Sequence, residues 1–319
     1  MKDRFGRTID YMRISITDRC NLRCAYCMPC VPRLPHSDIL RYEEILRVVR
    51  AALGLGITRF KVTGGEPFAR KGAADFIAAL KAEPGVACVT VTTNGTHLIE
   101  ALPQLVAAGV DGVNVSLDAV DPERYRQITG SDQAEKVLDA VEQCAKSGIR
   151  TKVNSVLLED NQDQIISLAG LAERMSVDVR FIELMPIGCG GEHSGPDAGA
   201  ALSRLKEAYP GLAPVREVRG NGPAVYYADE RLLGRIGFIT ARSRSFCAGC
   251  NRIRLTSTGL VKPCLCDGDT VDLRALLRGG ATDGEISVAL ESAVWGKPAA
   301  HGIAEGDVTE RRRMNQIGG

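Results

Sequence analysis

Segments typical of β-strands and α-helices alternate through the first 185 residues of the chain. The strand-like segments span residues 12–17, 59–63, 88–93, 112–117, 151–156 and 179–184. Helix-like segments lie between them at residues 42–53, 73–81, 97–108, 134–146 and 163–174. Repeated strand–helix units predict a parallel sheet covered by helices. Six units are typical of an α/β fold with a partial (β/α)6 TIM-like barrel, because a closed barrel of this type has eight.

The pattern changes after Gly188, where a glycine-rich loop begins. One helix near residues 200–208 is followed by short strands, a second group of cysteines and further helices. We therefore expect a barrel core of residues 1–188 and a smaller C-terminal α+β segment of residues 189–319. The smaller segment is expected to pack on the mouth of the barrel.

Charge and cysteine content restrict the class of protein. A net charge of +1 gives no reason to expect nucleic acid or an anionic membrane as a partner. The amino terminus lacks the apolar core of a signal peptide, and no apolar run is long enough to span a bilayer, so we expect a cytoplasmic protein. Eleven cysteines in that reducing compartment are more typical of metal binding or catalysis than of disulfides.

Polar side chains occupy one face of nearly every expected strand, because successive side chains of a strand alternate between its faces. Arg13 shares a face with Ser15, whereas Ile14 and Ile16 lie on the other. The complete polar set is Arg13, Ser15, Thr17, Lys61, Thr63, Thr90, Thr92, Asn94, Asn114, Ser116, Asp118, Lys152, Asn154 and Arg180. A solvent-exposed sheet face is the alternative, but parallel sheets are normally buried on both faces. The pattern favours a polar, cationic lumen that holds a large anionic ligand.

Three cysteines, Cys20, Cys24 and Cys27, follow directly after the first expected strand. This Cys-x3-Cys-x2-Cys spacing can ligate three irons of a cubane cluster and leave the fourth iron open. Zinc sites usually combine Cys-x2-Cys pairs, so the triplet is a poor match to zinc. We interpret it as an iron–sulfur site.

A second group contains Cys247 and Cys250, with Cys264 and Cys266 farther along the chain. Four cysteines could close a zinc site and three could hold a second iron–sulfur cluster, and the spacing does not decide between them. Arg252 and Arg254 are two residues apart, so on an extended segment they point the same way. Paired guanidinium groups suit a polyphosphate, although a solvated basic edge strand would show the same pattern.

The triplet, with Tyr26 before its last cysteine, resembles the radical S-adenosylmethionine superfamily. In that superfamily the open iron binds the cofactor's amino and carboxylate groups, and the reduced cluster releases a 5′-deoxyadenosyl radical. Gly64-Gly65-Glu66-Pro67, after the second expected strand, resembles the superfamily turn that receives the methionine amino group. The resemblance implies the partial six-stranded barrel that the strand pattern also predicts.

Both cysteine groups together with the terminal Gly318-Gly319 resemble the GTP 3′,8-cyclase family of molybdenum cofactor biosynthesis over essentially the whole chain. The resemblance implies two [4Fe–4S] clusters, S-adenosylmethionine and GTP. It assigns the first cluster to Cys20, Cys24 and Cys27 and the second to Cys247, Cys250 and Cys264. The residues expected around S-adenosylmethionine are Tyr26, Gly65, Ser116 and Met185. Those expected around GTP are Arg13, Lys61, Thr92, Lys152, Arg180, Arg252 and Arg254.

The resemblance also implies that Gly318 and Gly319 reach into the active site and support turnover. Lys61 departs from the arginine common in the family, which keeps the charge but loses bidentate geometry. Cys266 is an alternative to Cys264 as the third ligand of the second cluster, although the family spacing favours Cys264. We also expect an electron-donor protein as a partner, and a monomer or homodimer as the oligomeric state. The alternatives are a peptide-modifying radical enzyme with an auxiliary cluster and a non-catalytic metal-cluster scaffold that binds nucleotides.

Overall fold

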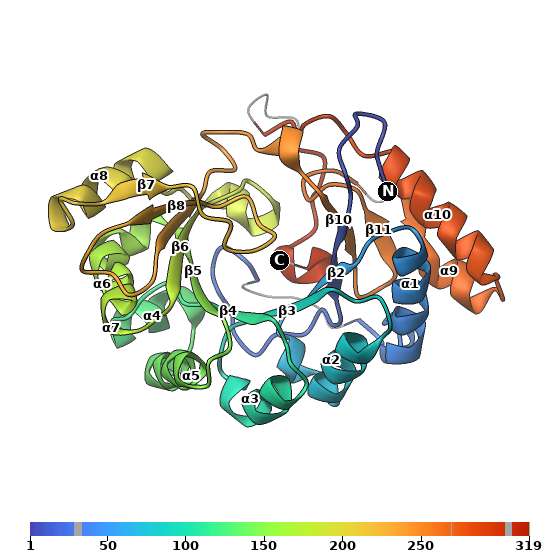
Figure 1. Cartoon of the computed structure of the whole chain (residues 1–319), viewed down its shortest axis with the longest axis horizontal. Coiled ribbons are helices and arrows are strands. Elements are labelled where there is room, and N and C mark those ends of the chain that lie inside the picture. The colour runs from blue at the N-terminus through green and yellow to red at the C-terminus, as the bar shows by residue number, and fades with distance from the viewer. Residues whose placement is uncertain (29–33, 269, 304–307, 319) are drawn as a thin grey trace.

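The computed structural model describes residues 1–28, 34–268, 270–303 and 308–318. Its strands form one twelve-stranded sheet in the order β12-β11-β10-β1-β2-β3-β4-β5-β6-β9-β8-β7. The sheet curves into an open barrel with most helices on its outer face (Figure 1). No helix in the described part of the chain is long and apolar enough to cross a membrane.

Six parallel strands form the centre of the sheet, as the sequence predicts. They are β1 (Tyr11–Ser15), β2 (Arg59–Thr63), β3 (Cys88–Thr93), β4 (Gly112–Ser116), β5 (Thr151–Leu157) and β6 (Asp178–Glu183). The connecting helices are α1 (Tyr42–Gly54), α2 (Ala73–Ala82), α3 (Leu98–Ala107), α4 (Pro122–Thr129), α5 (Ala134–Lys146), α6 (Ile165–Ala169) and α7 (Leu171–Arg174). The expected α/β fold with a partial barrel is confirmed.

Two helical details differ from the expectation. Helix α4 was not expected, although Asp121 caps it by accepting a hydrogen bond from the Arg124 amide and Pro122 occupies its first turn. The expected helix over residues 163–174 is divided into α6 and α7 at Gly170. Glycine is a weak helix former, and periodicity alone does not reveal such a break.

The C-terminal strands extend both edges of the barrel sheet, an arrangement that the sequence did not predict. Strand β9 (Ile236–Ile239) pairs in parallel with β6, and β10 (Arg252–Leu255) pairs in parallel with β1. The remaining strands, β7 (Ala213–Val215), β8 (Val225–Ala228), β11 (Leu260–Lys262) and β12 (Val271–Asp272), pair antiparallel outside them. The remaining helices are α8 (Ala198–Ala208), α9 (Leu273–Arg278), α10 (Asp283–Trp295) and α11 (Met314–Ile317). A division at residues 188/189 stays a prediction.

The apolar face of each central strand packs against the outer helices. Ile14, Phe60, Val91 and Val115 are completely buried in one hydrophobic core. Burying one such side chain stabilises the fold by about 1.5–3 kcal/mol. The apolar half of the alternation is therefore committed to the core, which leaves the polar half facing the inside of the barrel.

Candidate active site

The barrel encloses a cavity of about 530 Å³. Every residue that the resemblance assigned to a cluster, to S-adenosylmethionine or to GTP lines this cavity. The polar lumen predicted from strand alternation is confirmed. Ile182 and Leu184 share the strand parity of Arg180 and form an apolar part of the wall.

Strand register places the two cysteine groups at opposite ends of β1. Cys20 follows the carboxyl end of β1. Strand β10 runs parallel to β1 with Arg252 beside Tyr11, so Cys250 lies before the amino end. Strand β11 runs antiparallel to β10, with Lys262 beside Arg254, so the chain continues from Lys262 toward the amino end of β10 and reaches Cys264. The cationic residues therefore lie between two sets of thiols.

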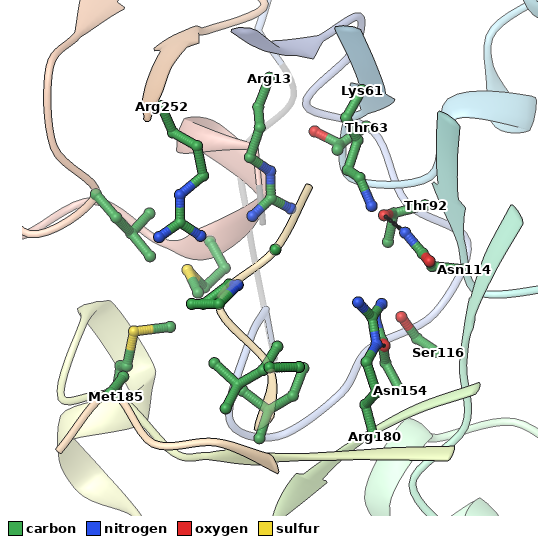
Figure 2. A pocket seen from close by; sticks show the side chains of 18 of the residues that line it. Arg13, Lys61, Thr63, Thr92, Asn114, Ser116, Asn154, Arg180, Met185 and Arg252 are labelled. Atoms are coloured by element: carbon green, nitrogen blue, oxygen red, sulfur yellow. Dashed lines mark hydrogen bonds between the residues drawn. The ribbon is translucent and has the colours of Figure 1, made fainter. Parts of the chain in front are cut away.

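Cationic side chains enter the cavity from opposing walls. Arg13, Lys61 and Arg252 extend from one side toward Arg180 on the other (Figure 2). Burial lowers the pKa of Arg13, and the nearby Arg252 and Arg180 lower it further. Burial, together with Arg180 and Arg13, holds the pKa of Lys61 well below its usual value. This mutual repulsion creates a site that an anion would stabilise.

Lys152 adds to this cationic set and is held by protein partners. Its ammonium donates to the Tyr226 hydroxyl at 2.8 Å and to the Arg219 carbonyl, and it lies 3.2 Å from the Asp178 carboxylate. Burial lowers the pKa of Lys152 to about 8, with Arg180 adding to the effect and Asp178 opposing it. Because a lysine has three donors, this arrangement engages them all.

The first cysteine loop is fixed by close packing against the Gly-Gly-Glu-Pro turn. The Gly65 amide donates to the Thr17 carbonyl at 2.8 Å, and the Glu66 amide donates to the Arg19 carbonyl at 2.7 Å. A Cβ atom at Gly65 would lie 2.4 Å from the Arg19 carbonyl oxygen, so only glycine allows this approach. The turn therefore positions the segment that leads into Cys20.

Glu66 anchors the same turn to the end of β3. Its carboxylate accepts hydrogen bonds from the Phe68 amide at 3.0 Å, the Thr93 hydroxyl at 2.8 Å and the Asn94 amide at 2.6 Å. Burial raises the pKa of Glu66 to about 7, although these donors act in the opposite direction. Asn94 in turn donates to the sulfur of Cys20 at 3.7 Å.

The residues expected around S-adenosylmethionine gather at the carboxyl end. The Tyr26 hydroxyl donates to Asp118 at 2.7 Å, and Asp118 also accepts from the Val156 amide at 2.8 Å. Burial raises the pKa of Asp118 to about 6. Ser116 and Met185 line the same cavity (Figure 2). The assigned roles of these residues stay predictions.

The second cysteine group is held by a buried lysine that sequence reasoning missed. Lys297 donates to the Arg252 carbonyl at 2.9 Å and to the Pro263 carbonyl at 2.5 Å, which ties the segment after Cys250 to the segment before Cys264. Cys264 and Cys266 both line the cavity, and Cys264 is the more exposed of the two, because Cys266 is only 2% exposed. The choice of Cys264 as the ligand stays a prediction.

Several other contacts in the site had no clear signal in the sequence. Asp178 and Arg219 come from different segments, and the Arg219 Nη2 atom lies 2.9 Å from the carboxylate. Tyr226, from β8, reaches Lys152 only because the C-terminal strands extend the sheet. Asn154 and Asp118 did lie on the polar face in the strand alternation, but they were not assigned a role.

The C-terminal tail enters the barrel. Helix α11 lies inside the ring of strands (Figure 1). The Gly318 carbonyl accepts a hydrogen bond from Arg254 Nη1 at 2.5 Å. Gly318 has φ +75°, and a Cβ atom there would lie 2.8 Å from Ser15 Cβ, so the position requires glycine. Gly319 lies outside the described residues.

An open α/β barrel with a cysteine triplet after its first strand and a Gly-Gly-Glu-Pro turn after its second defines a radical S-adenosylmethionine enzyme. The model of the Radical SAM superfamily matches residues 14–172, and that of Molybdenum Cofactor Synthesis C matches residues 177–303. The GTP 3′,8-cyclase of Pelotomaculum thermopropionicum is 41% identical over the full length of both chains. That of Clostridium perfringens strain SM101 is 40% identical, also over both full lengths. The chain belongs to the GTP 3′,8-cyclase family.

Solved structures support the fold. SuiB of Streptococcus suis bound to S-adenosylmethionine is 16% identical, with a TM-score of 0.63 over 95% of this chain and 68% of SuiB. At this identity the likeness concerns the fold alone. The peptide-modifying and scaffold alternatives are not favoured, because full-length relatives at about 40% identity are cyclases.

Enzymes of this family use S-adenosylmethionine and two [4Fe–4S] clusters. The donor sets here fit these groups, because two sets of cysteine thiols face one cavity. In the described part of the chain, no three Cys, His, Asp or Glu side chains are gathered around one point as ligands of a single ion. The Cys-x3-Cys-x2-Cys spacing of the first set suits a cubane, in which each cysteine ligates a different iron.

Proposed function

We propose that this protein converts GTP into (8S)-3′,8-cyclo-7,8-dihydroguanosine 5′-triphosphate in the cytoplasm, the first step of molybdenum cofactor biosynthesis. The observation that carries the substrate assignment is the cationic cavity between two groups of thiols. A triphosphate carries several negative charges, and arginine binds phosphate oxygens bidentately. An uncharged substrate would leave the repulsion among Arg13, Lys61 and Arg180 uncompensated.

The carboxyl end of the cavity is the proposed cofactor end. Cys20, Cys24 and Cys27 would hold the first cluster, with S-adenosylmethionine bound by Tyr26, Gly65, Ser116 and Met185. The Tyr26–Asp118 hydrogen bond fixes the tyrosine ring beside the triplet. When bound, the reduced cluster and S-adenosylmethionine would supply a 5′-deoxyadenosyl radical, the species needed to remove a hydrogen atom from ribose C3′. Two electrons are needed, one to reduce the first cluster and one, with a proton, to convert the cyclised radical into the dihydro product, and an electron-donor protein is the proposed source of both.

The amino end is the proposed substrate end. Cys247, Cys250 and Cys264 would hold the second cluster beside the guanine ring. The triphosphate and ribose would be held by Arg13, Lys61, Thr92, Lys152, Arg180, Arg252 and Arg254. The protein contacts of Lys152 already engage its ammonium group. We therefore propose that Lys152 supports GTP binding through its positive charge and by anchoring the segment that contains Arg219.

The residues of the chain orient the reacting atoms and limit the access of water. Attack of the C3′ radical on guanine C8 requires both atoms to be held in one conformation, so positioning supplies much of the catalysis. Gly318, fixed by Arg254, restricts the space beside Ser15 and Thr63. We propose that Gly318 and Gly319 complete the wall that confines the substrate.

The test is an anaerobic incubation of the reconstituted enzyme with GTP, S-adenosylmethionine and a strong reductant, followed by chromatography and mass spectrometry. The proposal predicts 5′-deoxyadenosine formation that depends on GTP, together with a product that has the mass of GTP and a different retention time. Formation of 5′-deoxyadenosine without any isomer of GTP would contradict the substrate assignment. ATP in place of GTP serves as the matched control.

A further inference from the structure

The tail of residues 308–318 contacts the loops of both cysteine groups. Asn315 donates from Nδ2 to the Asp18 carbonyl at 2.7 Å, just before the first cysteine triplet. Ile317 is completely buried in an apolar cluster with Ile187 and Cys266, and Cys264 packs against the same cluster. The tail therefore rests on both sets of cluster-bearing segments.

One buried ion pair fixes the tail to the second cysteine loop. Lys262, completely buried at the end of β11, bonds to the carboxylate of Glu310 and to the Asp267 carbonyl. The Glu310 side chain is only 3% exposed. Because Lys262 lies two residues before Cys264, the ion pair joins the tail directly to a proposed ligand segment.

Glu310 also organises the tail itself. Its carboxylate accepts from the Arg312 amide at 2.7 Å and from the Arg312 guanidinium at 2.6 and 3.0 Å. The Glu310 amide donates to the Cys266 carbonyl at 3.0 Å. One residue thus bonds to β11, to the Cys266 segment and to the next turn of the tail.

The path of the tail beyond Glu310 leaves little room for a second arrangement. A Cβ atom at Gly188 would lie 2.8 Å from the Arg312 carbonyl oxygen, so the tail passes directly over this glycine. The chain then continues through α11 to Gly318, where Arg254 holds the carbonyl. Displacing Glu310 therefore displaces the segment that brings Gly318 to Arg254 and Ser15.

We propose that the Lys262–Glu310 pair is a latch that seats the C-terminal tail, and that Glu310 is a positioning residue that acts through Gly318. The inference deepens the proposed function and rests on it, because it gives the tail a part in cyclisation. A buried carboxylate is retained only with good partners, and removing one partner of such a pair is strongly disruptive. The latch couples the order of the tail to the segment that carries Cys264.

Two variants test the latch from its two sides. Glu310→Gln keeps the shape and removes the charge, and Lys262→Met removes the partner while Arg312 remains. Glu291→Gln, on the exposed surface of α10, is the matched control. Iron content and thermal melting of each reconstituted holoenzyme establish that the clusters and the fold are retained.

The first readout is limited proteolysis with trypsin, which reports the tail independently of GTP chemistry. The tail carries Arg311, Arg312 and Arg313, and the rate of cleavage follows the population of the unseated tail. Both latch variants are expected to raise cleavage at these sites about tenfold or more, with the control unchanged. Unchanged cleavage in Glu310→Gln, or an effect of Glu310→Gln that Lys262→Met does not share, would overturn the latch.

The second readout is the ratio of cyclised product to 5′-deoxyadenosine. An unseated tail is expected to lower this ratio at least about threefold, through kcat more than through the KM for GTP, because the substrate is confined less well. Raised cleavage with an unchanged ratio would show that the tail has no part in cyclisation and would overturn the positioning role. Failure of the proposed function can be told apart from failure of the latch. In that case the wild-type enzyme would form no isomer of GTP, while both latch variants would still show faster cleavage of the tail.

Discussion

The two ends of the cavity place chemically similar thiols in opposite electrostatic surroundings. At the carboxyl end, burial and the neighbouring Cys20 raise the pKa of Cys27 to about 12, and Asp118 adds to the effect. At the amino end, burial raises the pKa of Cys250, but Arg252 and Lys297 outweigh it and the pKa falls below its usual value. The first end is thus rich in acidic groups and the second in cationic groups.

This difference separates two tasks within one cavity. The Asp118 carboxyl group, which lines the cavity at the carboxyl end, suits a cofactor with a positive sulfonium and a methionine ammonium. The cationic end suits a triphosphate. Radical formation and substrate binding are therefore assigned to opposite ends of the cavity.

The largest effect is expected from removing one cysteine at each end. Cys24→Ser should abolish 5′-deoxyadenosine formation altogether, because the first cluster loses a ligand. Cys250→Ser should abolish the cyclised product but leave measurable cofactor cleavage, because the carboxyl end is intact. Both products are measured by mass spectrometry in the reconstituted variants. Equal loss of cofactor cleavage in both variants would break the separation.

Arg252→Ala should weaken substrate binding at the amino end alone. Loss of a charge-assisted contact costs about 1.5–3 kcal/mol, so KM for GTP should rise about 10- to 100-fold. The KM for S-adenosylmethionine should change less than about twofold, as expected for a residue outside the cofactor end. Steady-state kinetics measures both KM values. Arg231→Ala, which removes one positive charge outside the cavity, is the control. A larger effect on the cofactor KM than on the GTP KM would contradict the assignment.

Lys152 should make GTP binding depend on pH. Its pKa of about 8 means that the ammonium is charged below pH 8 and neutral above it, so KM for GTP should rise as pH increases through this value. Asp178→Asn removes the nearby carboxylate that favours the charged form, so the rise should begin about one pH unit lower. Lys152→Arg, which stays charged, should flatten the rise. An identical pH profile in all three enzymes would exclude Lys152 as its source.

The smallest effect concerns stability at the carboxyl end. The folded-state pKa of Glu66 is raised from 4.5 to about 7, so folding favours its protonated form. Its stabilising contribution is present below pH 4.5 and is lost as pH rises toward 7. Relative to Glu66→Gln, the wild-type protein should lose on the order of 1–3 kcal/mol of stability across this window.

Thermal melting from pH 5 to pH 7.5 measures this contribution in both proteins. Asp111→Asn, outside the Gly-Gly-Glu-Pro turn, controls for the general effect of removing a carboxylate. Parallel melting curves for Glu66→Gln and the wild-type protein would show that Glu66 does not titrate in this way.

The sequence predicted the barrel and its lumen because both follow from local patterns. Alternation along a strand decides whether Arg13 or Ile14 faces the cavity, and no distant contact is needed. The C-terminal strands could not be placed in this way. The pairing of Arg252 with Tyr11 joins segments far apart in the chain, and short strands carry little register information.

The site residues that the sequence did not predict were missed for the same physical reason. Lys297 follows a helix without any local motif, and its importance comes from two carbonyls, those of Arg252 and Pro263, brought together by the folded chain. Asp178 likewise meets Lys152, and Glu310 meets Lys262, only through tertiary packing. Isolated charged residues of this kind read as ordinary surface residues in a sequence.

The central claim is that a radical formed at one end of the cavity acts on the ribose of GTP held at the other. The most direct measurement uses GTP deuterated at C3′ in a single-turnover anaerobic reaction, with mass spectrometry of the 5′-deoxyadenosine. The account predicts 5′-deoxyadenosine that carries one deuterium atom, together with a cyclised product that has lost it. Unlabelled 5′-deoxyadenosine, with deuterium retained in the nucleotide, would contradict the account.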